Sequence, residues 1–336
     1  MNICAVIPTF NRRDSVIRAV ESALEQTRPA DEIVVVDDGS VDGTSEALTR
    51  RYGSRIEVVW QPNRGVGAAR NRGVRLTEAE LIVFLDSDDI WRPQKLEHQL
   101  AGMNDPAIIL CATNWRRDGA ARDAFSDLGL PTVAAELHTP MRRLLNPGGH
   151  ALLTSTWMVR RSSFWKAGGF DESLRVAGDA ALLFQLGCCG RFLVLPQVLA
   201  ESSSIVDQWQ LTNHRDPAYL KEATRNATMI LLALQSEMDG FPDDVRLAYQ
   251  RLLTDYLRRD LEYLAMDGRA IVARQRARQL IARRSMDAAG TLTALVALVC
   301  PSIIGLRGRI GLSLNAAAKR GPAKKRRSAA MIAVGS

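Results

Sequence analysis

Short apolar runs alternate with helical patterns over the first ~90 residues. Between the first two runs, apolar residues recur at helical spacing after Asp14, a candidate N-cap, and residues 44–52 fit a second helix. Most of the runs are continuous rather than alternating, which is typical of parallel strands covered on both faces. The order strand, helix, strand, helix predicts an α/β protein with a doubly wound sheet. The runs that predict strands cover residues 3–7, 33–36, 56–60 and 81–85.

Polar clusters follow three of these predicted strands. They are Pro8-Thr9-Phe10-Asn11, Asp37-Asp38-Gly39-Ser40 and Asp86-Ser87-Asp88-Asp89. Ligands of open parallel sheets bind at the carboxyl ends of the strands. We therefore expect the three clusters to meet in one crevice, and this convergence weighs more than any single motif.

The acidic cluster at 86–89 carries the sharpest chemical signal. Carboxylates two residues apart after a strand point the same way, and Mg²⁺ or Mn²⁺ commonly bridges one or two carboxylates to a diphosphate. The alternative is an acidic turn in which an aspartate caps a helix that starts near Pro93. The buried run 81–85 in front of the cluster favours the metal site.

The cluster at 37–40 offers acceptors for a base N–H or a ribose hydroxyl, and Gly39 lets the backbone approach a ligand closely. An Asx-type turn, with Ser40 or Asp42 as a helix cap, is the structural alternative. The segment 63–71 adds Arg64 and Arg70, whose planar donors suit a base edge or a phosphate. Its alternative is the start of a close-packed helix rich in alanine and glycine.

Taken together, these segments resemble glycosyltransferase family 2 over residues 1–100, and more weakly to about 200. The resemblance implies an A-type glycosyltransferase fold with a parallel or mixed sheet, a nucleotide-diphosphate sugar donor, with UDP favoured, Mn²⁺ or Mg²⁺, and inversion at the anomeric carbon. It places Asp38 and Arg70 near the base, Asp86 near the ribose and metal, and Asp88 on the metal. The donor-binding residues it implies are Pro8, Thr9, Asn11, Asp38, Gly39, Asn63, Arg64, Gly65, Arg70, Asp86 and Ser87.

A second part of the family pattern is similar to the segment 166–172 followed by Gly178-Asp179. By this resemblance Asp179 is the general base, and acceptor binding falls on Gly169, Phe170 and Asp171. The family usually has an acid where this chain has Gly178, which leaves open how the acceptor is held. The structural alternative for Asp179 is the cap of a helix over 180–187. The Gln-x-x-Arg-Trp segment of processive synthases is not found, which favours a single transfer.

Charge and composition bear on nucleic-acid binding and on the cellular compartment of the protein. The chain has 336 residues and a net charge of +7, but eight Lys or Arg and no acid lie beyond residue 306. The basic balance therefore belongs to the tail, and no specific nucleic-acid binding is expected. The five cysteines show no paired spacing, which indicates a reducing compartment. No basic leader precedes the first apolar run, so we expect a cytoplasmic protein.

The organisation we predict has four parts. A nucleotide-sugar-binding half covers residues 1–104, an acceptor-binding half 105–205, a helical region 206–306, and a basic, disordered tail 307–336. Residues 288–306 lack charge, and we expect 288–327 to contact the inner face of a membrane peripherally, with a spanning or a packed helix as alternatives.

The predicted function is transfer of a sugar to a glycan or lipid-linked glycan in cell-surface polysaccharide biosynthesis. Two other functions stay open. A nucleotidyltransferase would carry a Gly-rich basic signature after the first strand, which 8–11 is not. A non-catalytic sugar-nucleotide binding protein at the membrane surface is kept open by Gly178.

Overall fold

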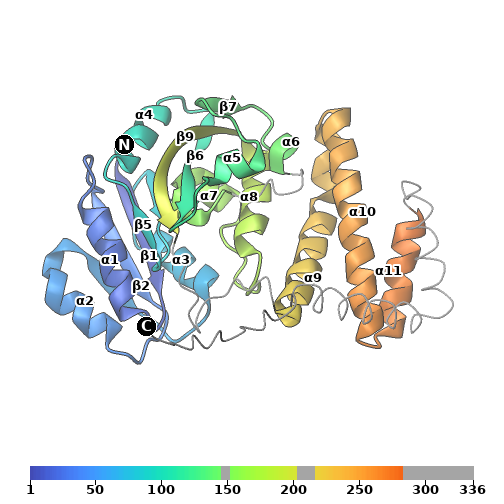
Figure 1. Ribbon diagram of the computed structural model, residues 1–336, viewed down its shortest axis with the longest axis horizontal. Helices are drawn as coiled ribbons and strands as arrows, with labels where there is room; N and C mark the ends of the chain where they lie inside the picture. Colours follow the sequence, from blue (N-terminus) through green and yellow to red (C-terminus); the bar gives the residue numbers. More distant parts are fainter. Residues whose placement is uncertain (145–151, 203–215, 283–336) are drawn as a thin grey trace, which may run out of the picture. The chain divides into compact units, whose positions relative to one another are not determined.

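The computed structural model describes residues 1–144, 152–202 and 216–282. A nine-stranded mixed sheet lies within residues 1–253, with the order β3-β2-β1-β4-β8-β6-β9-β5 and β7 paired to β9 (Figure 1). Strands β1 to β4 are mutually parallel, and β8 is antiparallel to both of its neighbours. The strands are β1 Ile3–Thr9, β2 Glu32–Asp37, β3 Glu57–Trp60, β4 Leu81–Phe84, β5 Asp89–Trp91, β6 Ile108–Arg117, β7 Ala135–Leu137, β8 Trp157–Arg160 and β9 Arg191–Ser202.

The predicted strands and the first two helices are confirmed, with ends that shift by a few residues. Helix α2 covers the residues expected of it, whereas β5 was not predicted because three residues carry too short a pattern. The α-helices are α1 Arg13–Leu24, α2 Thr44–Tyr52, α3 Val66–Arg75, α4 Lys95–Gly102, α5 Ala124–Leu128, α6 Met141–Leu144, α7 Arg161–Lys166, α8 Gly178–Cys189, α9 Pro217–Ala233, α10 Asp243–Met266 and α11 Ala270–Ala282.

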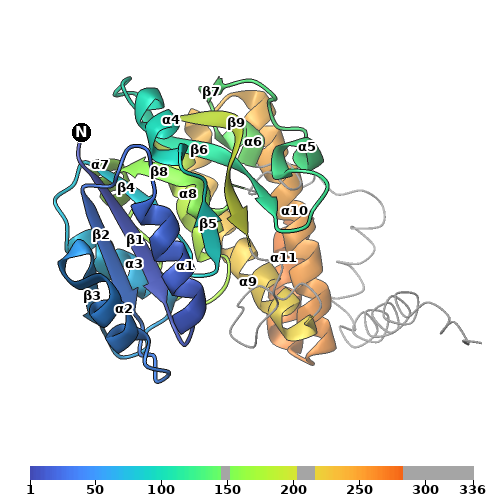
Figure 2. The same ribbon diagram turned by 60° about the vertical axis from the view of Figure 1, so that its left-hand side comes forward.

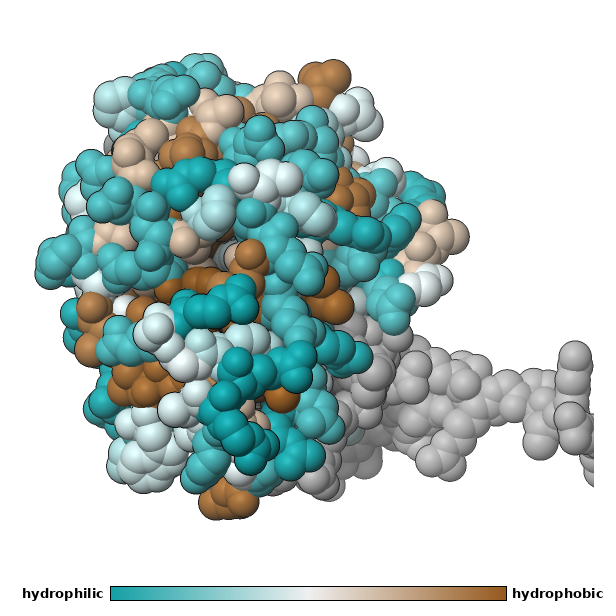
Figure 3. Space-filling view, turned by 90° about the vertical axis from the view of Figure 1, so that its left-hand side faces the viewer, coloured by the Kyte–Doolittle hydropathy of each residue, from teal (hydrophilic) through white to brown (hydrophobic). Residues whose placement is uncertain are grey.

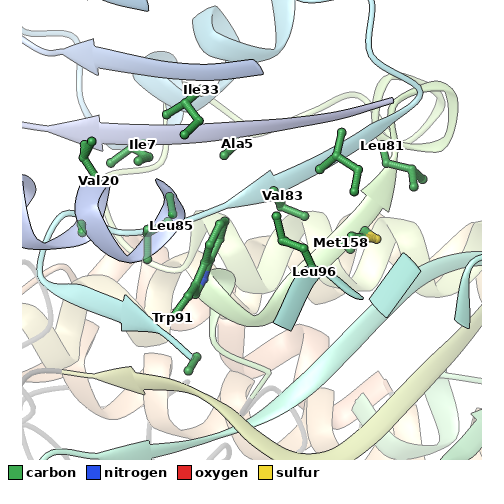
Figure 4. Packing of buried hydrophobic residues seen from close by; sticks show 14 of the residues in the cluster. Ala5, Ile7, Val20, Ile33, Leu81, Val83, Leu85, Trp91, Leu96 and Met158 are labelled. Carbon is green, nitrogen blue, oxygen red and sulfur yellow. The ribbon is translucent and has the colours of Figure 1, made fainter. Parts of the chain in front are cut away.

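Both faces of the parallel strands are covered, as their continuous apolar pattern predicts. Alternate residues of β1, among them Ala5 and Ile7, join a core with Trp91 and Leu96 on one face (Figure 4). On the other face α3 contacts Val6 so closely that a Cβ added at Gly73 would lie 2.4 Å from Val6 Cγ1. Burying each large apolar side chain contributes about 1.5–3 kcal/mol, so this strand anchors the loop that follows it.

Helices α1 and α2 lie on one side of the parallel strands and α3 on the other (Figure 2). On the face shown in Figure 3, hydrophilic residues dominate and the hydrophobic ones form small, separate groups. That distribution is normal for a solvated surface.

Two helix starts differ from the prediction. The N-cap of α1 is Arg12, and Asp14 lies in the first turn, where it accepts from Arg13 Nε instead of capping the helix. Gly43 is the N-cap of α2, although Asp42 accepts from the Thr44 amide at 3.2 Å. An acid in a first turn still favours the helix through the positive end of its dipole.

The chain divides into two compact units, residues 1–253 and 254–336. The predicted boundaries at 104/105 and 205/206 both fall inside the first unit, and the four-part organisation stays a prediction. In the second unit Arg276 Nε donates to Asp260 Oδ2 at 2.8 Å, and the Asp260 side chain is 3% exposed. This buried pair joins α10 to α11 and leaves neither charge unpaired.

Within residues 1–144, 152–202 and 216–282, no helix has the length and apolar character that crossing a membrane requires. The segment 288–327, for which a peripheral membrane contact is predicted, lies outside the described residues, as does the basic tail.

Candidate active site

The turn after β1 is tied to the loop after β2. Asn11 adopts a left-handed backbone with φ 50°, and its amide donates to Ser40 Oγ at 2.8 Å. Its side-chain Oδ1 accepts from the Val41 amide at the same distance. Pro8 and Thr9 are buried at the end of β1, and Thr9 Oγ1 has no hydrogen-bond partner among the described residues. A buried hydroxyl without a partner is a candidate contact for a bound ligand.

The two aspartates after β2 have different partners. Asp37 Oδ1 accepts from the Ser40 amide at 2.8 Å, so the Asx-type turn considered for this loop is present. Asp38 Oδ1 accepts from Gln61 Nε2 at 2.7 Å and from the Arg64 amide at 2.9 Å. Asp38 is 4% exposed, and these hydrogen bonds hold the segment after β3 in place.

Asp38 and Gly39 both contact the segment between β3 and α3. Asp38 Oδ2 accepts from the Gly65 amide at 2.8 Å, and Gly65 is the N-cap of α3. Gly39 lies against the exposed Asn63 with φ 92°, and a Cβ there would come within 2.9 Å of the Asn63 amide nitrogen. Gly39 thus closely approaches another part of the chain, and its approach to a bound donor stays a prediction.

Helix α3 directs Arg70 toward the acidic cluster. Arg70 is 6% exposed, donates through Nη2 to Asp86 Oδ1, and lies over the Phe170 ring with Cζ 5.0 Å from its centroid. The close packing of Ala68, Ala69 and Gly73 is also present, so the structural alternative for this segment and the placement of Arg70 coexist. An aromatic face and a carboxylate together fix the guanidinium in one orientation.

The three aspartates of the acidic cluster differ in exposure: Asp86 and Asp88 are partly exposed, whereas Asp89 is buried. Asp86 and Asp88 keep side chains that are each 24% exposed, and Arg12 Nη1 lies 2.8 Å from Asp88 Oδ2. Asp89 is buried in β5 and accepts from Ser155 Oγ at 2.5 Å. Burial, and secondarily the charges of Asp86 and Asp88, raise the pKa of Asp89 well above its usual value.

Ser155 joins this cluster from a distant part of the chain. Its Oγ also accepts from the Asp86 amide at 3.0 Å, and its carbonyl accepts from Trp91 Nε1 at 2.7 Å. Ser87, beside Asp86, is buried. The helix after the cluster begins at Lys95 with Gln94 as its N-cap, so the aspartates do not cap it.

The segment predicted to bind the acceptor packs against α3. Asn71 Oδ1 accepts from the Phe170 amide at 2.9 Å, and Asn71 Nδ2 donates to the Phe170 carbonyl at 2.8 Å. Phe170 is 2% exposed, whereas Asp171 is exposed and accepts from the Ser173 amide. Gly169 has φ 68° and adjoins Asn71. The structure gives Gly169 and Phe170 packing contacts, and acceptor binding by these residues stays a prediction.

Glu172 completes the link to the basic segment. Arg64 and Arg75 lie 3.0 and 3.3 Å from its carboxylate oxygens, and these interactions, after the hydrogen bond from Asn71, lower the pKa of Glu172. Neither Asn71 nor Glu172 was predicted as a site residue. Asn71 lies in the segment 63–71 and Glu172 in the segment 166–172. An amide donor in one segment and a carboxylate acceptor in the other were the signal that could have indicated their contact.

Asp179 is exposed in the first turn of α8 and accepts from the Ala180 amide at 2.8 Å. The helix begins at Gly178, so Asp179 is not its cap; the N-cap is Ala177, which has φ 64°. Ala177 and Asn11 are the only two non-glycine residues with positive φ in the described ranges. Such backbone strain concentrates at functional sites.

Hydrogen bonds and ion pairs join the predicted donor-binding segments into one connected group. Asn11 contacts the loop after β2, Asp38 holds the start of α3, Arg70 on α3 pairs with Asp86, and Arg12 pairs with Asp88. The prediction missed Arg12, Gln61 and Ser155. Arg12 directly follows Asn11 and could have been suspected from its charge, but nothing local marks Ser155, which lies ~70 residues beyond the acids.

Residues 4–168 match the family model described as glycosyl transferase family 2. Among curated relatives, the Bacillus subtilis (strain 168) protein TuaG, named for teichuronic acid biosynthesis, is 35% identical over 129 residues, covering 37% of this chain and 51% of TuaG. The succinoglycan biosynthesis protein ExoO of Rhizobium meliloti (strain 1021) is 30% identical over 203 residues, covering 58% of each. The matched stretches thus span about half of these relatives.

Solved structures share the fold. The S. aureus TarS fragment 1–349 in complex with UDP-GlcNAc superposes with a TM-score of 0.60 at 19% identity, covering 89% of this chain and 80% of the fragment. The mannosyltransferase PcManGT of Pyrobaculum calidifontis, in complex with GDP-Man and Mn²⁺, gives a TM-score of 0.52 at 18% identity, covering 91% and 87%. At this identity the likeness concerns the fold alone.

Proposed function

Because residues 4–168 belong to glycosyl transferase family 2 and the chain has the A-type glycosyltransferase fold, we propose that it transfers a sugar from a nucleotide-diphosphate sugar to a hydroxyl acceptor with inversion. The connected group of Asp38, Arg70, Asp86 and Asp88 carries the proposal. It combines acceptors for a nucleoside, cationic donors for phosphate oxygens and two carboxylates for a cation within one set of contacting loops.

UDP-sugars are the donor class we favour. The fold neighbours include a protein bound to UDP-GlcNAc and another bound to GDP-Man, so a nucleoside-diphosphate sugar suits this architecture and the base is decided by local contacts. The names of TuaG and ExoO support an acceptor in cell-surface polysaccharide biosynthesis, a glycan or a lipid-linked glycan.

The carboxylate pair fits Mn²⁺ or Mg²⁺ only with help from the donor. Within the described ranges, no group of three or more His, Cys, Asp or Glu side chains is arranged to hold a metal ion. Asp86 and Asp88 would supply hard oxygen ligands, and the diphosphate and water would have to complete the coordination, as is common for Mg²⁺. A bound cation would supply charge stabilisation for the departing diphosphate.

The proposed reaction needs one proton acceptor on the side opposite the leaving group. Asp179 takes the proton from the acceptor hydroxyl while the hydroxyl oxygen forms a bond to the anomeric carbon. The bond from that carbon to the diphosphate oxygen breaks, and the nucleoside diphosphate leaves with the electron pair. Arg70, fixed between Asp86 and the Phe170 ring, would hold the nucleotide and keep the anomeric carbon in line.

A donor screen tests this function. Nucleotide sugars are tested with Mn²⁺ by thermal shift, since a ligand that binds the native state raises the melting temperature, and nucleoside diphosphate release is then measured. Asp88→Ala should remove the metal-dependent part of donor binding. Asp14→Ala, a change of the same kind at an exposed helix position, should leave it intact. Equal donor affinity in the Asp88 variant with and without chelator would contradict the assignment.

A non-catalytic sugar-nucleotide binding protein is the second candidate. It is favoured by Gly178, which replaces the usual acid, and by the single local hydrogen bond that Asp179 makes. The same screen separates the two: donor binding without release of nucleoside diphosphate, in the presence of any acceptor tried, would support the binding protein.

A further inference from the structure

Arg12 occupies a distinctive position in the candidate site. It follows Asn11 in the turn after β1, as the N-cap of α1, and its Nη1 lies 2.8 Å from Asp88 Oδ2. The side chains are 13% and 24% exposed, so the pair is partly shielded from water. The carboxylate to which we assign the cation is therefore already paired with a cationic side chain.

The local backbone explains why Arg12 and not its neighbour makes this contact. The left-handed Asn11 is tied to Ser40 and Val41, which sets the direction in which the chain enters α1. Arg13, the next residue, is 51% exposed and pairs with Asp14, which is 86% exposed. Two adjacent arginines thus have separate environments, and only one faces the acidic cluster.

A cation and the Arg12 guanidinium compete for the same carboxylate. Coordination of Asp88 to a divalent ion brings that ion within a few ångströms of a positive group, and the repulsion is stronger in a partly buried site than in water. A diphosphate reduces this competition, because its oxygens can accept hydrogen bonds from the guanidinium in the same geometry as a carboxylate does. The cation is then disfavoured alone and favoured together with a nucleotide.

We propose that Arg12 is a positioning residue that couples cation binding to nucleotide binding by holding Asp88 until a diphosphate arrives. The inference rests on the proposed function, and it deepens it by assigning the order of assembly: cation and nucleoside diphosphate enter the site together. Arg70 differs from Arg12 because its guanidinium also lies over the Phe170 ring, so it keeps its place beside Asp86.

The test measures Mn²⁺ binding to the full-length chain by electron paramagnetic resonance, without nucleotide and with UDP or GDP. The proteins compared are the wild type, Arg12→Gln and Arg13→Gln, the last being the matched control. Without nucleotide, Arg12→Gln should bind Mn²⁺ about tenfold more tightly than the wild type, a coupling of ordinary size for linked sites. The gain in Mn²⁺ affinity caused by the nucleotide should shrink by about the same factor. Arg13→Gln should match the wild type in both measurements.

Arg12→Lys keeps the positive charge beside Asp88, so its Mn²⁺ affinity without nucleotide should stay within about threefold of the wild type. Thermal unfolding without ligand shows that each variant is folded. Equal Mn²⁺ affinities of Arg12→Gln and the wild type without nucleotide would overturn the proposal, and so would an equal gain in Arg13→Gln, which would indicate a general charge effect. Failure of the proposed function is seen separately, as absence of donor turnover by the wild type, and does not alter the comparison of Mn²⁺ affinities.

Discussion

The carboxylates Asp38 and Asp179 lie in two regions of the site that are organised differently. Asp38, in the region that we propose binds the nucleotide (the nucleotide side), is 4% exposed and accepts three hydrogen bonds from the segment that leads into α3. Asp179 is exposed and accepts one bond from the next residue. The nucleotide side is thus shaped by its own polar contacts before any ligand binds, which is the condition for electrostatic preorganisation.

The Asp179 region depends instead on its backbone. Ala177 has a left-handed conformation, which costs an alanine about 1–2 kcal/mol. The preceding carbonyl, that of Val176, accepts from Asn226 Nδ2 of α9 at 2.9 Å. The proposed base is exposed and follows a strained turn, whereas the proposed donor-binding residue Asp38 belongs to a buried polar network.

The largest effect is expected for Asp179→Asn. An amide cannot take the hydroxyl proton, so turnover should fall by about 10²–10⁴ while nucleotide affinity changes less than twofold. Steady-state transfer rates and donor titrations check this, with Asp243→Asn, an exposed acid on α10, as the control. Turnover near the wild-type value would remove Asp179 from the mechanism.

Gly169→Ala tests how tightly the two regions are joined. The new Cβ would lie 2.9 Å from Asn71 Oδ1, at a residue with φ 68°. We expect the free energy of unfolding to fall by about 2–4 kcal/mol. Gly168→Ala has φ 91° but nothing within 4 Å, so it should show only the backbone part, about 1–2 kcal/mol. Denaturant titrations of both variants give the difference, and equal losses would show that the contact with Asn71 is unimportant.

The pH dependence of stability probes a buried polar network around Lys95, the first residue of α4. Lys95 Nζ donates to Gln99 Oε1 at 2.6 Å and lies 4.3 Å from the Trp91 ring centroid, and Gln99 donates to carbonyls of Cys111 and Thr156. Burial lowers the pKa of Lys95 from 10.5 to about 7. Below that pH the ammonium is charged in the folded and unfolded states, and the folded state carries the full cost of burying it.

As pH rises from about 7 toward 10.5, the unfolded state binds more protons than the folded state, so this contribution to stability increases. Between pH 7 and 9 the free energy of unfolding of the wild type should rise by about 2 kcal/mol relative to Lys95→Met. Urea titrations at several pH values measure the difference. Parallel curves for the two proteins would mean that the folded-state pKa of Lys95 is near its usual value.

The smallest effect is expected for Asn226→Ala. Loss of the bond to the Val176 carbonyl should loosen the turn before Asp179 and lower turnover about five- to tenfold, with nucleotide affinity unchanged. Asn104→Ala removes a similar amide-to-carbonyl bond, to the Ala101 carbonyl near the end of α4, and is the control. A drop in nucleotide affinity instead of turnover would show that α9 acts on the donor side.

Local patterns made the nucleotide side predictable. Continuous apolar runs predict buried parallel strands, and polar residues that follow such strands must gather at one edge of the sheet. The placement of Asp38, Arg70 and Asp86 could therefore be predicted from short segments, because the pattern of each segment does not depend on distant residues. The Asp14 cap failed for the converse reason, since the N-terminus of α1 is set by the contacts of Asn11 with the loop after β2.

The sequence by itself determined the strand and helix order of the first ~90 residues, the edge at which the polar loops meet and the chemical types that they bring. Only the tertiary structure decided which partners those groups take: Arg12 for Asp88, Ser155 for Asp89, and Asn226 for the turn before Asp179. The physical reason is that secondary structure and sheet edges follow from local periodicity, whereas side-chain pairing across 50 or more residues depends on how separate elements pack, which no local pattern encodes.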